Sequence, residues 1–101
     1  MKIPQRDLRD LFNQGQYMAR AERGELIPCL KSVTARKVGG NLDGMCGYTV
    51  GYDDRATGVR VFLVQYFMSD DGEIGASGLE DPKWLHHHGV AYIPLETLPP
   101  W

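Results

Sequence analysis

The stretch that decides the fold lies between Met45 and Ser77 and reads MCGYTVGYDDRATGVRVFLVQYFMSDDGEIGAS. Between Cys46 and Asp53, large residues alternate with small or polar ones, which is typical of a strand with one packed face. Residues 59–68 are apolar at nearly every position, so we expect this strand to be central and covered on both faces. Polar, glycine-containing turns separate the segments. The pattern therefore predicts consecutive hairpins, which form an antiparallel meander.

Both faces of the predicted sheet require cover. On the first strand, the face with the small and polar residues, which we call the sparse face, carries two glycines, Gly47 and Gly51. Glycines at such positions indicate that a bulky group lies over them or that backbone approaches closely. We expect an N-terminal helix to cover one face. The other face is left for a second helix, the C-terminal tail or a second molecule.

The chain before the meander is predicted to be helical. Apolar residues recur at helical spacing from Leu8 to Phe12 and resume at Tyr17, and Gly24 provides a stop. We therefore expect one helix in two pieces, broken near residues 13–15. The next residues, 25–28, are interpreted as a connector.

Between this connector and the meander, residues 30–38 are rich in β-branched side chains, which predicts a further strand. After the meander, Asp81 suits a helix N-cap, Pro82 suits the first turn, and Gly89 suits the position just after a helix end. The sequence therefore predicts one or two helical turns over residues 82–88.

Gly89 would then release residues 90–95 as a final strand, which Pro94 places at an edge of the sheet because proline cannot donate to a ladder. These patterns predict an α+β fold in the order α-β-β-β-β-α-β, with an antiparallel meander of four to five strands. A chain of 101 residues has the size of one domain. We divide it into a helical segment (1–28), the meander (30–77), a short helix with an edge strand (81–95) and a tail (96–101).

The composition is that of an ordinary globular protein, with 43% hydrophobic and 24% charged residues. No segment approaches the roughly 20 apolar residues of a membrane span, and the N-terminus lacks the apolar core of a signal peptide. Cys29 and Cys46 do not form a CxxC motif, so we expect free thiols and a cytoplasmic location.

The charge is divided unevenly along the chain. Residues 1–42 carry eight basic and four acidic side chains, a balance of +4, whereas residues 43–101 carry three basic and nine acidic ones, a balance of −6. Two interpretations remain open. The split can steer association with a charged partner or promote self-association, or the fold can interleave the halves so that the charges cancel.

Three adjacent histidines, His86 to His88, are the most conspicuous chemical feature. On a helix, neighbouring side chains point about 100° apart, so the three cannot share one metal ion, and no metal or cofactor is predicted. They suit capping of a helix end or surface packing. The enzymatic alternative is a small toxin-type ribonuclease, in which His87 or His88 acts as acid or base and Lys83 or Arg60 steadies phosphate.

A second alternative is nucleic-acid binding through the basic N-terminal helix, led by Arg20 and Arg23. Tyrosines of the sheet, such as Tyr48 and Tyr66, would then stack on bases. The acidic character of the sheet region opposes this alternative, because it repels phosphate.

The leading hypothesis is a small, non-enzymatic protein that binds another macromolecule, with another protein as the preferred partner over a nucleic acid. A homodimer is one version of it, and no membrane is involved. Compact chains of this kind are often accessory or inhibitor proteins of bacteria or their phages. Such a protein would use acidic and aromatic side chains to cover a basic site on its partner. The predicted contact surface consists of Asp70, Asp71, Glu73, Glu80, Asp81 and Trp84.

Overall fold

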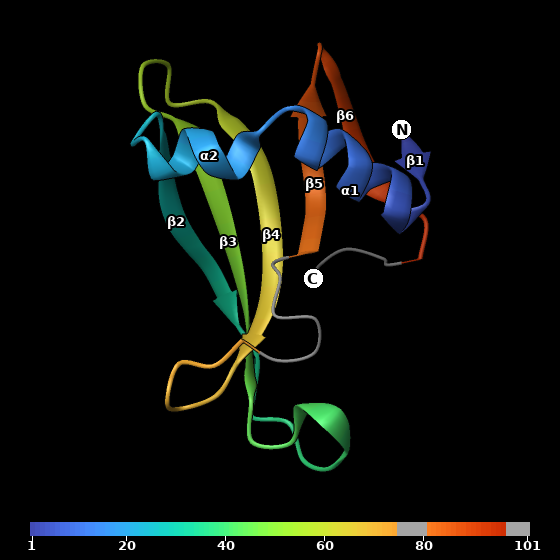
Figure 1. Cartoon of the computed structure of the whole chain (residues 1–101), viewed down its shortest axis with the longest axis vertical. Helices are drawn as coiled ribbons and strands as arrows, with labels where there is room; N and C mark the ends of the chain where they lie inside the picture. The colour runs from blue at the N-terminus through green and yellow to red at the C-terminus, as the bar shows by residue number, and fades with distance from the viewer. Residues whose placement is uncertain (75–80, 97–101) are drawn as a thin grey trace.

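The computed structural model describes residues 1–74 and 81–96 and shows helices packed on one sheet (Figure 1). The strands in this part of the chain are β1 (Lys2–Ile3), β2 (Leu26–Val33), β3 (Cys46–Asp54), β4 (Arg60–Met68), β5 (Asp81–His87) and β6 (Val90–Pro94). The helices are α1 (Gln5–Gln14) and α2 (Tyr17–Glu22), with a 3₁₀ turn, η1, at Gly40–Leu42.

The six strands have the spatial order β1-β6-β5-β4-β3-β2. From β2 to β6, each strand pairs antiparallel with the next along the chain, whereas β1 pairs parallel with β6. The predicted α+β class and antiparallel meander are therefore confirmed, and β4 is central as its apolar pattern predicted. The sheet has six described strands where four to five were predicted, and the order of elements differs at both ends.

The core lies between the helices and one face of the sheet. In Figure 1, α2 crosses one end of β2 to β4, and α1 lies beside β5 and β6. The ring of Phe62 on β4 is 0% exposed, and its centroid lies 4.9 Å from that of Phe12, 6.0 Å from that of Tyr17 and 4.6 Å from that of Tyr52. Leu8, from α1, is buried in the same cluster. Aromatic packing on Phe62 therefore joins both helices to the sheet.

The predicted break in the N-terminal helix is confirmed. Helix α1 ends at Gln14, α2 begins at Tyr17, and Gln16 between them has a left-handed φ of 51°. This change of direction turns Tyr17 into the core together with Phe12.

The prediction of a helix over residues 82–88 is wrong, because Asp81–His87 form strand β5. His88 and Gly89 have φ values of 48° and 80° and form a two-residue hairpin turn between β5 and β6. A glycine with positive φ serves such a turn as well as a helix end, so Gly89 did not discriminate between them. Pro82 is tolerated because the β4–β5 ladder has an irregularity next to it, where Lys83 is the extra residue.

The two glycines on the sparse face of β3 are covered, as the sequence predicted, by side chains of β4. A β-carbon on Gly47 would lie 2.8 Å from Cε1 of Phe67. One on Gly51 would lie 2.5 Å from Cζ of Arg60. These contacts lie on the face opposite the helices, since Gly47 and Gly51 alternate with residues that pack on the core.

The two sheet edges differ from the prediction. Strand β2 begins at Leu26, inside the predicted connector, and it is the edge on one side. Strand β6 was expected to be an edge, but β1 pairs outside it, and the backbone N–H groups of Ile93 and Leu95 donate to β1-side carbonyls at 2.9 and 2.8 Å. The β1–β6 ladder therefore does not depend on an N–H group at Pro94. Two residues are too few to show a strand pattern in the sequence.

Other predictions fall partly on residues that the structure does not describe. Of residues 73–77, the last part of the predicted meander, the structure describes a single bridge between Met68 and Ile74, and residues 75–77 lie outside the described residues. Residues 97–101, which are all but the first residue of the predicted tail, also lie outside them. Neither helix described here is long and apolar enough to cross a membrane.

Candidate functional site

Strand β2 carries an exposed row of aliphatic side chains, which we call the β2 strip: Ile27, Leu30 and Val33. Their exposed fractions are 47%, 57% and 50%. Leu30 and Val33 pair with Val50 and Tyr48 of β3, so they lie on the helix face, whereas Ile27 pairs with Asp53 and lies on the other face. The strip therefore wraps around the open edge of the sheet.

The strip is exposed because the helices cover only one end of β2. Leu26, the first residue of the strand, is buried near α2, and the rest of β2 runs beyond the helix (Figure 1). On the same face, the rings of Tyr48 and Tyr66 stack with a centroid distance of 5.5 Å beside Val33. Half-buried aromatic surface thus continues the strip inward onto the sheet.

The backbone edge of β2 is protected against simple strand addition. Pro28 lacks an N–H group, and the ladder is irregular between Leu30 and Ser32, where Lys31 is the extra residue. Proline, lysine and bulges are common devices that prevent unwanted pairing at a sheet edge. Side chains rather than a continuous backbone ladder are therefore available for recognition on β2.

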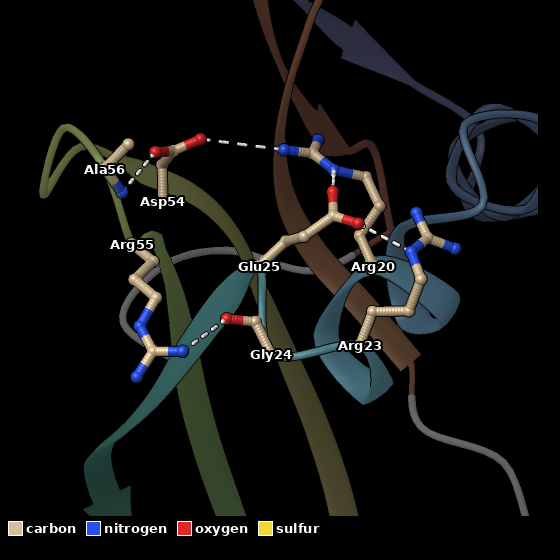
Figure 2. Close-up of a pocket in the computed structure, with 7 residues that line it drawn as sticks. All are labelled: Arg20, Arg23, Gly24, Glu25, Asp54, Arg55 and Ala56. Carbon is tan, nitrogen blue, oxygen red and sulfur yellow. Dashed lines mark hydrogen bonds and ion pairs between the residues drawn. The ribbon is translucent and has the colours of Figure 1, made fainter.

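A pocket of about 560 Å³ adjoins the start of β2 (Figure 2). Its walls come from the end of α2, the turn into β2 and the loop between β3 and β4. The lining residues, which together we call the arginine pocket, are Arg20, Arg23, Gly24, Glu25, Asp54, Arg55 and Ala56.

Two carboxylates in the arginine pocket hold Arg20 and Arg23 in place. Glu25 accepts from Nε of Arg23 at 2.5 Å and from Nε of Arg20 at 3.4 Å, and Nη2 of Arg20 lies 3.6 Å from Asp54. The hydrogen bond from Arg23 holds the pKa of Glu25 below its ordinary value. The pKa of Asp54 is lowered by backbone N–H groups of the following loop. Both carboxylates are therefore charged at neutral pH.

The third arginine of the pocket has a different environment. Nη1 of Arg55 donates to the carbonyl of Gly24 at 3.4 Å, and its backbone N–H donates to that of Glu25 at 2.9 Å. Figure 2 shows Arg55 apart from the two arginines that converge on Glu25. Within the described residues, no carboxylate pairs with Arg55. The pocket thus contains three guanidinium groups and two carboxylates, and its net charge is one positive unit.

The three histidines are separated by the strand. His87 is buried on the helix face, where Tyr17 Oη lies 2.6 Å from its Nδ1. His88 is exposed in the hairpin turn, with its ring 4.0 Å from that of His87. His86 lies on the other face, stacked on Trp84. Burial, and then the neighbouring His88, lower the pKa of His87, so the Tyr17 hydroxyl can donate to a neutral imidazole.

This buried histidine predicts a pH dependence of stability. The unfolded chain takes up a proton at His87 near the ordinary pKa of 6.5, whereas the folded chain takes it up only at lower pH. The free energy of unfolding is therefore expected to be highest above this pH and to fall as pH decreases below it, until folded His87 is also protonated. Urea denaturation between pH 8 and pH 5 measures this slope.

The matched variants for this measurement are His87→Gln and His86→Gln. Glutamine at position 87 cannot titrate, so that variant should lose much of the slope, whereas the exposed His86→Gln variant should keep it. The basic side chains beside the pair are His88, whose ring lies 4.0 Å from that of His87, and Arg20, whose guanidinium lies 5.8 Å from the centroid of the Tyr17 ring. Equal slopes in the two variants would show that His87 does not carry the effect.

The structure does not bring together the residues of the predicted ribonuclease site. His87 faces Tyr17 under the helices, whereas the Arg60 guanidinium pairs with Asp53 and lies over Gly51 on the opposite face. Lys83 is buried in the irregular part of β5, and His88 lies in the exposed turn.

The predicted acidic contact residues occupy two separate parts of the fold. Asp70, Asp71 and Glu73 lie in the turn after β4, where Asp70 pairs with Arg36 at 2.9 Å, and Asp71 accepts a hydrogen bond from Ser69 that lowers its pKa. The others are on β5: Asp81 at its start, ion-paired with Arg9, and Trp84 half-buried within it. Glu80 lies outside the described residues.

The fold interleaves the two charged halves of the chain. Among the residues that the structure describes, three ion pairs join a base of the first half to an acid of the second: Arg9 with Asp81, Arg20 with Asp54, and Arg36 with Asp70. Among the two interpretations of the charge split, the structure therefore favours cancellation between these groups.

Sequence reasoning found Arg20 and Arg23 but missed Arg55 and the β2 strip. Arg55 lies in a loop more than 30 residues away, and only the β2–β3 pairing brings it to the pocket. One available signal for the strip was Pro28, since proline within a strand indicates an edge.

Comparisons with known proteins gave no further guide to the site. No protein-family model matches the chain, and no curated protein or solved structure showed significant similarity to it. Among the described residues, no three histidine, cysteine or acidic side chains cluster in a way that could hold a metal ion.

Proposed function

We propose that this chain is a small non-enzymatic binding protein that contacts another protein through the β2 strip. The observation that carries the proposal is the exposure of three aliphatic side chains, Ile27, Leu30 and Val33, along one edge strand. Leu30 and Val33 are neighbours on the helix face of this strand, and exposed apolar side chains grouped in this way are typical of interaction sites. The strip also adjoins charged groups at one end, as the polar rim of a protein interface does.

The free energy gained by burying the β2 strip is modest for each side chain and larger for the three together. Complete burial of an aliphatic side chain is worth about 1.5–3 kcal/mol, so covering the exposed half of each residue contributes about 1 kcal/mol. A stable interface covers about 800 Å² on each partner, more than three side chains provide. The stacked Tyr48 and Tyr66 beside Val33 supply further apolar surface on the same face.

The β2 strip supports the proposal better than the acidic surface does. Asp70 and Asp81 are already paired with arginines of the same chain, so a basic partner would have to compete with those pairs. The aliphatic groups of the strip, in contrast, contact water over about half of their surface. A partner that covers them does not have to break an ion pair within the chain.

A capture experiment with β2 variants tests this function. We expect the Leu30→Glu/Val33→Glu double variant to retain at least tenfold less partner from a lysate of its host than the wild-type chain retains. Charges placed at the centre of an apolar contact oppose its desolvation. The control is Val59→Glu, a substitution of a 59%-exposed valine in the β3–β4 loop.

Both variants change exposed residues, so circular dichroism should show the wild-type fold in each. Light scattering of the purified chain tells whether the partner is a second copy. If the double variant retains every bound protein as well as the control does, contact through the β2 strip is excluded.

A further inference from the structure

We infer that the β2 strip and the arginine pocket form one docking surface, and that its occupant is an acidic, apolar polypeptide segment. The inference rests on the proposed function and specifies the chemistry of the partner. The two features are contiguous, because Gly24 and Glu25 line the pocket and Leu26 begins β2 directly after them. A segment lying along β2 therefore meets the arginines at one end of the strand.

The charge of this edge favours an acidic segment. Arg55 has no carboxylate partner among the residues described, and Glu25 engages Arg23 through Nε, which leaves the two terminal nitrogens of Arg23 facing outward from that ion pair. A guanidinium binds a carboxylate in a planar, two-pronged arrangement through such nitrogens. Lys31, the extra residue at the irregularity of β2, adds a further positive charge on the same strand.

The apolar part of the surface favours a polypeptide over a nucleic acid. The exposed side chains of the strip are aliphatic, whereas single-stranded nucleic acids are bound by aromatic side chains that stack on bases. The stacked Tyr48 and Tyr66 are in contact with each other and half-buried, so their faces are partly occupied. An aliphatic centre with arginines at its margin is the composition of a protein–protein contact.

Selection from a random dodecapeptide phage library against the immobilised full chain tests the inference. The expected peptides combine at least one Asp or Glu with two or more Val, Ile or Leu. A synthetic peptide of the most enriched sequence should bind the Arg23→Gln/Arg55→Gln variant about tenfold more weakly than wild type, by fluorescence anisotropy. Arg6→Gln is the control, since Arg6 is an exposed arginine of α1 outside the pocket.

The outcomes separate this inference from the proposed function. Enriched peptides without acidic residues, no enrichment at all, or equal affinity for the pocket variant and Arg6→Gln would overturn the acidic partner. The proposed function would still stand if the Leu30→Glu/Val33→Glu variant lost its partner. Pocket-dependent binding of a fluorescent 20-nucleotide single strand, without peptide enrichment, would assign the pocket to phosphate and also overturn the inference.

Discussion

Replacing Phe62 with alanine is expected to lower the free energy of unfolding by about 3–5 kcal/mol. The ring is 0% exposed, and it contacts Phe12 and Tyr17 from the helices and Tyr52 from the neighbouring strand. Its loss leaves a cavity in the core cluster that joins both helices to the sheet. Domains of this size have a total stability of about 5–15 kcal/mol, so a large share would be lost. Urea denaturation followed by circular dichroism measures the change.

The matched control is Leu63→Ala, one residue along the same strand. Leu63 points to the opposite face, which the described helices do not cover, and it is half-buried. We expect a loss of about 1 kcal/mol, typical of a substitution without a large cavity. If the two variants were equally destabilised, the core would not lie mainly on the helix face.

The second large effect is expected at Gly15, where alanine should cost about 1–3 kcal/mol by overpacking. A β-carbon there would collide with the Tyr17 ring, lying 2.8 Å from both Cδ2 and Cζ. The ring cannot move away cheaply, because it is buried and hydrogen-bonded to His87 at 2.6 Å. The φ of Gly15 is −78°, so the cost arises from crowding and not from backbone strain.

Thermal unfolding tests this prediction, since 1 kcal/mol shifts the Tm of a domain of this size by about 4–8 °C. Asn13→Ala is the control, because Asn13 is exposed on the same helix and its substitution should leave the Tm nearly unchanged. A Gly15→Ala variant as stable as the control would show that Tyr17 does not hold the position described here.

The sequence predicted the parts of the fold whose patterns were long and clean. Alternation in β3 and the apolar run of β4 identified a central hairpin, and the helical spacing around Phe12 and Tyr17 identified both helices. In contrast, the seven residues of β5 were too short to show a period. There, Asp81, Pro82 and Gly89 are as suitable for a helix as for a strand with a bulge and a tight turn.

The candidate surface was less predictable than the fold, for a physical reason. A strand pattern does not say which strand ends the sheet, so the exposure of Leu30 and Val33 depends on pairings made elsewhere. Likewise, the sequence predicted that the acidic residues contact a partner, whereas the fold pairs Asp70 with Arg36 and Asp81 with Arg9. Long-range pairing, which local sequence does not encode, determined which groups remained accessible.

The most direct test of the β2 strip as the partner-binding surface is site-specific photo-crosslinking. The photoreactive residue p-benzoylphenylalanine would be placed, one position at a time, at Leu30, Val33, Asp70 and Trp84, and each chain irradiated in host lysate. We predict that a covalent partner adduct forms from positions 30 and 33 and not from positions 70 and 84. Adducts from Asp70 or Trp84 alone would contradict the account and restore the acidic surface as the site of contact.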